Sequence, residues 1–252
     1  MIFTIINFGF LFSIFVIFYK LNHLSKNLLI MLFFLLSSVF FLNNVIFNPG
    51  YFPDQEVYLN LVKSIRVLNF YFVSDGYTPM PNLSDRTFVA SGFMALIPNI
   101  FVFEIIDLSL SQKFLYLSTL VYFYKKNCLN KYSFAILFFM PSIILYTGLA
   151  LKESLLFSLV SLSFYNLLKN NFKTSLLILI ILLVIKPLIF ILVSWFSFLY
   201  LLWFYFKLSK KAKIVITSII LSLTLAIFLI FFNEFNEFLN LRRYSEAKAN
   251  RN

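Results

Sequence analysis

The chain has 252 residues, of which 61% are hydrophobic and only 12% are charged, and its net charge is +11. A soluble domain usually has about 45–50% apolar and about 25% charged residues, so this excess of apolar side chains needs a bilayer around it. The composition excludes a soluble enzyme, a nucleic-acid-binding protein and a disordered chain. Long unbroken apolar runs also exclude an outer-membrane barrel, whose strands alternate apolar and polar residues.

Basic clusters between the apolar runs orient the chain, because Lys and Arg gather in cytoplasmic loops. The clusters are Lys20/His23/Lys26, Lys125/Lys126/Lys131, Lys169/Lys173 and Lys207/Lys210/Lys211/Lys213. We expect all four at the cytoplasmic face, with the single cysteine, Cys128, as a free thiol beside the second cluster. Residues 1–19 lack the basic start and the cleavage site of a signal peptide, so they predict a retained helix.

The apolar segments between these clusters predict an all-α, polytopic transmembrane bundle of about eight spans that forms one domain over residues 1–252. Each interval between two cytoplasmic clusters must hold an even number of crossings, which assigns the spans in chain order. After the retained helix at 1–19, they fall at 28–47, within 99–124, at 133–150, at 154–168, at 174–206 as two helices that meet at Lys186-Pro187, and at 214–232. Residues 88–98 form a re-entrant or interfacial piece ahead of a single crossing, and 233–252 form a polar tail.

The main extracytoplasmic loop, residues 48–87, predicts an amphipathic helix on the membrane surface. Pro53 is a favourable first residue for a helix, and Asp54 and Glu56 fall in its first turn, where acids are stabilised. Apolar residues recur at three-to-four spacing at Val57, Leu61, Ile65 and Leu68. The acids therefore face water or a cavity, although helix initiation alone is an equally good reason for their presence.

Two further charged interruptions fall on the same predicted face of the membrane. Lys152-Glu153 breaks a long, almost uncharged stretch, and Lys186 precedes a proline. An ionisable residue at the centre of a transmembrane helix costs about 2.5–3.5 kcal/mol, so a polar cavity is one explanation. The alternatives are that Lys152 and Glu153 close a short loop and that Lys186 extends to the interface. Glu104 and Asp107 are expected to pair with Lys113 in a structural role.

These interruptions predict a site that combines carboxylates with cations. The carboxylates are Asp54, Glu56 and Glu153, with Asp75 and Asp85 as further candidates, and the cations are Lys152, Lys186 and Arg86. A carboxylate can deprotonate an acceptor hydroxyl while cations neutralise a phosphate leaving group. In a bilayer, this chemistry suits a polyprenyl-linked sugar. No Cys/His cluster, P-loop or GxSxG motif competes with it.

Two segments resemble membrane proteins of polysaccharide assembly. Pro53-Asp54-Gln55-Glu56-Val57-Tyr58 resembles the first outer loop of GT-C glycosyltransferases, in which a loop carboxylate is the base and the donor is a polyprenyl-phosphate sugar. The segment from Met140-Pro141 to Lys152-Glu153, followed by Lys186-Pro187, resembles O-antigen polymerase-like proteins. The likeness covers about residues 50–190. The chain is shorter than either family and has lysine where arginine is commoner, and it lacks the large outer domain of many GT-C enzymes.

The resemblance implies a glycosyltransferase of the cytoplasmic membrane with its active face outside. Asp54 would be the base, Glu56 or Glu153 would orient the acceptor or an optional divalent cation, and Lys152 with Lys186 or Arg86 would bind phosphate. The expected partners are a polyprenyl-phosphate-linked sugar and a glycan acceptor. A repeat-unit polymerase, a transporter or flippase, and an inactive subunit stay open as alternatives.

Overall fold

The computed structural model describes residues 2–48, 51–67, 86–129, 131–206, 209–219 and 222. Within these ranges every regular element is a helix, as the sequence predicts. The chain divides into two compact units, Met1–Val193 and Ser194–Asn252. The candidates Asp75 and Asp85 and the tail 233–252 lie outside the described residues.

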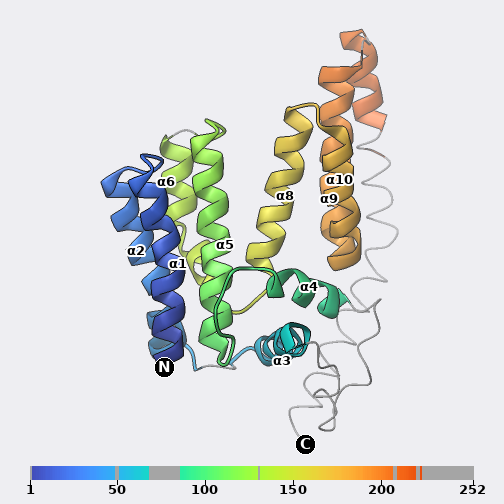
Figure 1. The fold of residues 1–252 in the computed structure, drawn as a ribbon. Helices are drawn as coiled ribbons and strands as arrows, with labels where there is room; N and C mark the ends of the chain where they lie inside the picture. The colour runs from blue at the N-terminus through green and yellow to red at the C-terminus, as the bar shows by residue number, and fades with distance from the viewer. Residues whose placement is uncertain are drawn as a thin grey trace, which may run out of the picture. The chain divides into compact units, whose positions relative to one another are not determined.

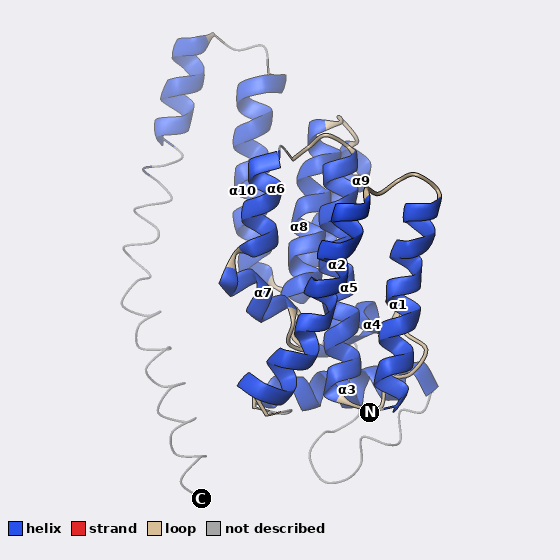
Figure 2. Ribbon diagram, turned by 90° about the vertical axis from the view of Figure 1, so that its left-hand side faces the viewer, coloured by secondary structure: helices blue, strands red, loops and turns tan. Residues whose placement is uncertain are grey.

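The first unit is an upright bundle with two short helices across one end (Figures 1 and 2). Its elements are α1 (Ile2–Lys20), α2 (Lys26–Phe41), the π-helical turn η1 (Leu42–Ile46), α3 (Pro53–Val67), α4 (Arg86–Ala95), α5 (Ile105–Lys125), α6 (Lys131–Phe139), α7 (Pro141–Thr147), α8 (Glu153–Leu168), α9 (Phe172–Ile185) and α10 (Pro187–Tyr200), which continues into the second unit before the π-helical turn η3 (Leu201–Tyr205). Figure 1 shows α3 and α4 crosswise beneath α8.

Three helices of the described residues are long and apolar enough to cross a membrane: Ile2–Lys20, Lys26–Ile46 and Pro187–Phe204. Two further apolar helices, Glu153–Leu168 and Phe172–Ile185, are shorter. α5 has 21 residues, enough for a hydrocarbon core of about 30 Å, but it carries Asp107, Lys113 and Lys125. These three candidate spans fit a helical membrane protein, and the total of about eight spans stays a prediction.

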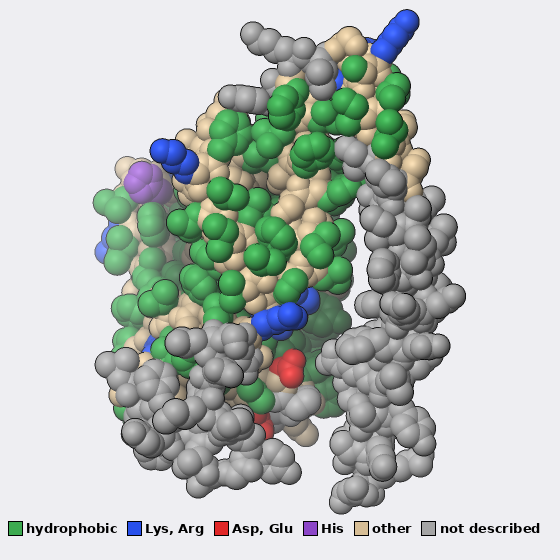
Figure 3. Space-filling model, turned by 90° about the vertical axis from the view of Figure 1, so that its right-hand side faces the viewer, with side chains coloured by type: hydrophobic (Ala, Val, Ile, Leu, Met, Phe, Trp, Pro, Cys, Tyr) green, Lys and Arg blue, Asp and Glu red, His purple; other side chains and the backbone are tan. Residues whose placement is uncertain are grey.

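Large apolar side chains cover the outside of the bundle. On α9 alone, Leu176, Leu177 and Ile180 are each more than half exposed. Figure 3 shows one face on which hydrophobic side chains dominate, with acidic groups in its lower part and basic groups at both its upper and lower ends. Apolar surface this extensive is rare on a soluble monomer and suits contact with lipid.

Three helices end in the same turn at the same end of the bundle. After α1, α5 and α8, an asparagine takes the left-handed conformation: Asn22 (φ 59°), Asn127 (φ 55°) and Asn170 (φ 60°). In each turn the next N–H donates to the carbonyl five residues earlier: His23 to Phe18, Cys128 to Phe123, and Asn171 to Asn166. These are Schellman caps with asparagine in the position that glycine usually holds. The first three basic clusters lie at these turns, as the predicted topology requires.

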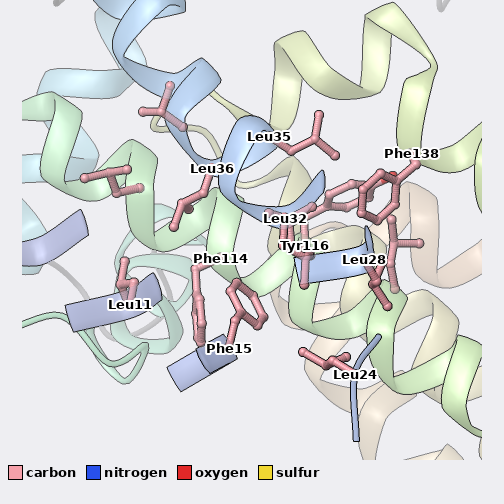
Figure 4. Close-up of a cluster of buried hydrophobic side chains, with 14 of the residues drawn as sticks. Leu11, Phe15, Leu24, Leu28, Leu32, Leu35, Leu36, Phe114, Tyr116 and Phe138 are labelled. Carbon is pink, nitrogen blue, oxygen red and sulfur yellow. The ribbon is translucent and has the colours of Figure 1, made fainter. Parts of the chain in front are cut away.

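Two hydrophobic clusters fill the first unit, one on either side of α5. The first joins α1, α2, α5 and α6, and Figure 4 shows Leu11, Phe15, Leu32, Phe114 and Phe138 converging in it. The second joins α3, α4, α5, α8 and α9. α5 is thus the central helix of the unit, and Leu115 packs against both clusters.

The helix predicted in the main loop begins at Pro53, as expected, and its buried face matches the predicted stripe in part, because Leu61 is buried and Ile65 is half-buried. Tyr58, Leu59 and Val62 are buried in the second cluster, whereas Val57 is exposed. The predicted stripe assumed a helix lying on lipid alone. α3 instead packs on α4 and α5, and these protein contacts bury neighbouring positions as well.

Prolines separate the helices near the end of the bundle that holds α3 and α4. α9 ends at Ile185 and α10 begins at Pro187, with Lys186 in a non-helical conformation between them, as predicted. The predicted span 133–150 is divided in the same way, because α6 ends before Met140 and α7 begins at Pro141. Proline has no N–H and disfavours the α conformation in the residue before it, which explains both breaks.

Candidate functional site

A cavity of about 360 Å³ lies between α8 and the junction of α9 with α10. Five of its lining residues are one stripe of α8, and two come from the junction: Glu153, Leu156, Phe157, Val160, Ser161, Lys186 and Ile189. Its walls are therefore mainly apolar, with one carboxylate and one ammonium group. We refer to it as the α8–α9 cavity.

Glu153 reaches the cavity from the first turn of α8. Its Oε2 atom is buried and has no hydrogen-bond partner among the described residues. The N-cap residue, Lys152, makes no side-chain hydrogen bond to the helix. The start of α8 therefore offers unpaired N–H groups and the positive end of a helix dipole beside the cavity.

Lys186 reaches the cavity because proline stops the helix on either side of it. Its carbonyl accepts hydrogen bonds from the N–H groups of Ile189 (3.0 Å) and Phe190 (3.1 Å), which starts α10 at the cavity wall. The side chain is half-buried. The structure thus brings together two of the predicted site residues, Glu153 and Lys186, which are 33 positions apart in the sequence.

The other predicted site residues do not line the α8–α9 cavity. Asp54 and Glu56 are exposed in the first turn of α3, and Arg86 is exposed at the start of α4. Lys152 is half-buried next to Glu153. The acids of the loop are therefore on the end of the bundle that also holds the cavity, but at its surface.

A different arginine, Arg66 of α3, links α3 to the end of α4 and to the turn before α5. We refer to α3 and α4 as the lateral layer. The Arg66 guanidinium donates to the carbonyls of Ala95 (3.2 Å), Ile97 (2.8 Å) and Asn99 (2.8 Å). These carbonyls end α4 and form the turn toward α5, where a cation is stabilised by the helix dipole. Burial lowers the pKa of the Arg66 guanidinium from its ordinary value, but an arginine keeps its charge at neutral pH. Sequence reasoning passed over this residue because its partners are backbone atoms.

Asp107 and Lys113 do not pair with each other, contrary to expectation. Six residues along a helix correspond to a rotation of about 240°, so the two side chains leave α5 on different faces. Asp107 accepts from Asn7 of α1 and from the N–H groups of Phe103 and Glu104, each at 2.9 Å. These bonds satisfy the carboxylate and give it the structural role that was predicted.

Lys113 is fully buried (0% exposed) and lies against α7. Its Nζ atom donates to the carbonyl of Ile144 (3.1 Å) and to Oγ1 of Thr147 (3.0 Å). It is one of a run of buried polar residues on α5, which are Asp107, Ser109, Ser111, Gln112 and Lys113. The sequence signal for this feature was the interval 107–113, where serines, glutamine and charges interrupt a stretch otherwise apolar enough to span.

The function is not indicated by a metal site in the described residues or by a known relative. No group of three or more His, Cys, Asp or Glu residues in the described part of the chain is arranged to hold a metal ion, so the optional divalent cation has no ligand set there. Comparison of the chain with protein-family models, with curated proteins and with solved structures finds no match. The function must therefore be argued from the site itself.

Proposed function

We propose that the chain is an integral membrane glycosyltransferase that takes its sugar from a polyprenyl-phosphate carrier in cell-surface polysaccharide assembly. The observation that carries the proposal is the α8–α9 cavity, which combines apolar walls with Glu153, Lys186 and the uncapped start of α8. A lipid phosphate has the matching parts, since its chain is apolar and its head group is anionic. Helix N-termini and lysines are both common phosphate ligands.

Each charged residue then has a role in the transfer. The acceptor hydroxyl attacks the anomeric carbon of the sugar, the bond from that carbon to the phosphate oxygen breaks, and the polyprenyl phosphate leaves. A carboxylate takes the hydroxyl proton, and a cation neutralises the phosphate. Glu153 is the better candidate for the base, because it shares the cavity with Lys186. Asp54 and Glu56, exposed on α3, are then placed to bind the glycan acceptor.

The test uses the full chain in liposomes with radiolabelled polyprenyl-phosphate sugars and a mixture of glycan acceptors. We expect Glu153→Gln and Lys186→Gln each to lower the release of polyprenyl phosphate by about 100-fold or more, as is typical for a general base or a charge-stabilising group. Lys173→Gln is the matched control, because Lys173 is exposed at the other end of α9. Full activity of both cavity variants would overturn the proposal.

A transporter or flippase is the second candidate, favoured by the buried polar run on α5. Ionisable residues inside a membrane bundle often mark the path of a substrate. The same liposomes separate the two functions. A carrier would move the labelled lipid to the opposite leaflet with its sugar–phosphate bond intact, whereas a transferase would break that bond.

A further inference from the structure

Polar atoms without partners gather around the first turn of α8. Both amide atoms of Gln112, Oε2 of Glu153 and Oγ of Ser154 are buried and have no hydrogen-bond partner among the described residues. Gln112 and Ser154 are 0% exposed. Folded proteins pair the great majority of such groups, because leaving one unpaired inside the protein is unfavourable. Three of them at one place therefore need a common explanation.

The register of α5 against α8 places Gln112 at this turn. Oγ1 of Thr119 on α5 and Oγ of Ser158 on α8 are 2.8 Å apart and share a hydrogen bond. Gln112 is two turns before Thr119 on the same face of α5, and Ser154 is one turn before Ser158 on the same face of α8. The two helices run in the same direction in Figures 1 and 2, so both residues lie to the same side of that bond.

Packing gives the same placement independently. Leu108, one turn before Gln112 on its face of α5, belongs to the second hydrophobic cluster, and Leu115, three residues after Gln112, packs against both clusters. Ala150 and Leu155, which bracket Glu153 and Ser154, belong to that cluster as well. The face of α5 that carries Gln112 therefore contacts the second cluster, to which residues on either side of Glu153 and Ser154 belong.

The chemistry of these groups favours hydroxyls as their ligand. An amide offers two donors and one acceptor, a serine hydroxyl offers both functions, and a carboxylate accepts. A second phosphate is disfavoured, because the Glu153 carboxylate repels it and Lys113, the neighbouring cation, is already bound to Ile144 and Thr147. Paired donors and acceptors at short spacing match the vicinal hydroxyls of a sugar.

We infer that Gln112, Ser154 and Glu153 form an inner subsite for the sugar, behind the α8–α9 cavity that takes the lipid phosphate. The inference rests on the proposed function. It assigns the sugar of the substrate to the inner subsite and the lipid phosphate to the α8–α9 cavity. Glu153 belongs to both, since it lines the cavity and adjoins Ser154. Its side chain must change rotamer to admit the sugar, because the inner groups are fully buried.

The experiment compares the affinity of the full chain in nanodiscs for two kinds of short-chain lipid. One is bare polyprenyl phosphate, and the other is the same lipid carrying glucose, galactose, mannose or N-acetylglucosamine. We expect at least one glycosylated lipid to bind the wild type about tenfold more tightly than the bare lipid, through hydrogen bonds that only the sugar makes. Gln112→Leu should remove this preference and leave the affinity for bare lipid unchanged, while Lys186→Gln should weaken both.

Gln55→Leu is the matched control, because Gln55 is a buried glutamine of α3 whose Oε1 accepts from the N–H of Phe52. It should lower thermal stability and keep the sugar preference, whereas Gln112→Leu should not lower stability. The inference is overturned if Gln112→Leu keeps the preference, or if no sugar binds more tightly than bare lipid. If the wild type binds neither lipid, the proposed function fails and the inference fails with it.

Discussion

Lys113 illustrates how a buried lysine is stabilised by a carbonyl and a hydroxyl group in place of a carboxylate. The ammonium group meets the carbonyl of Ile144 and the hydroxyl of Thr147, at the C-terminal end of α7. The negative end of a helix dipole stabilises a cation there, and the aromatic ring of Tyr116, 5.8 Å from Nζ, adds to it. The three groups belong to α5 and α7, so the lysine also holds these helices together.

The lysine and its partner should respond differently to substitution. Thr147→Val removes one acceptor and leaves the cation buried, so we expect the free energy of unfolding to fall by about 1–3 kcal/mol. Lys113→Met removes the charge but keeps an unbranched side chain, and should cost less than about 1 kcal/mol. Chemical denaturation in detergent micelles measures both. A larger loss for Lys113→Met than for Thr147→Val would contradict this account.

At the scale of elements, the layer of α3 and α4 is held to the bundle by apolar packing and by one arginine. Tyr58 and Leu59 of α3 and Met94 of α4 are buried in the second cluster. Arg66 then binds three carbonyls between Ala95 and Asn99, which joins the end of α3 to the turn before α5. This turn has no other cation among the contacts described for it.

Loss of Arg66 should loosen the lateral layer without unfolding the bundle. We expect Arg66→Ala to lower the free energy of unfolding by about 2 kcal/mol, since three charge-assisted hydrogen bonds are lost from a half-exposed group. Arg66→Lys should recover part of this, because an ammonium reaches fewer of the carbonyls at once. Hydrogen exchange of the backbone amides of Leu96, Ile97 and Asn99 should increase in both variants. Arg86→Ala, at an exposed arginine, is the control and should change neither measurement.

The elements that the sequence predicted well are those marked by local signals. Proline specified the start of α3 and the break before α10, and a single long helix follows α4 as expected. The buried face of α3 was predicted only in part, with Leu61 buried and Val57 exposed, because periodicity cannot distinguish lipid from a neighbouring helix. The partners of Lys113 and Asp107 were wrong for a related reason. They come from α7 and α1, and no spacing along α5 reveals them.

The residues of the candidate site also differ in whether the sequence alone could identify them. Glu153 and Lys186 were identifiable as charges in apolar surroundings, and the structure shows that they line one cavity. Gln112 and Ser154 were not identifiable, because an uncharged polar residue in an apolar helix is common and costs little to insert. The two residues are related only through the register of α5 and α8, which the hydrogen bond between Thr119 and Ser158 sets.

At the scale of the whole molecule, the turns after α1, α5 and α8 and the first turn of α8, which carries the cavity residue Glu153, lie toward opposite ends of the first unit (Figure 1). The positive-inside rule then predicts cytoplasmic Schellman turns and an extracytoplasmic cavity. Cys128 is a natural reporter, because it is exposed in the turn after α5 and is the single cysteine of the chain. In intact cells, a membrane-impermeant maleimide should leave it unlabelled.

The reciprocal variant tests the other end. With Cys128→Ser as background, Asp54→Cys should be labelled by the same reagent in intact cells, because Asp54 is exposed on α3. In inverted membrane vesicles the pattern should reverse, with Cys128 labelled and Asp54→Cys protected. Labelling of Cys128 but not of Asp54→Cys in intact cells would refute the assigned orientation and place the cavity on the cytoplasmic face. Labelling of both positions from one side would refute their placement on opposite faces of the membrane.

The three Schellman turns also bear on how the protein is made. Each closes with hydrogen bonds that span only five residues, so the pairs α1–α2, α5–α6 and α8–α9 need nothing distant to turn back on themselves. During synthesis at about 5–20 residues per second, each hairpin can enter the bilayer soon after it leaves the ribosome. α3 and α4 must wait, because the surfaces they bury against belong to α5, α8 and α9. The end of the first unit that carries the cavity is therefore completed only after α9 is synthesised, although α3 and α4 are translated much earlier.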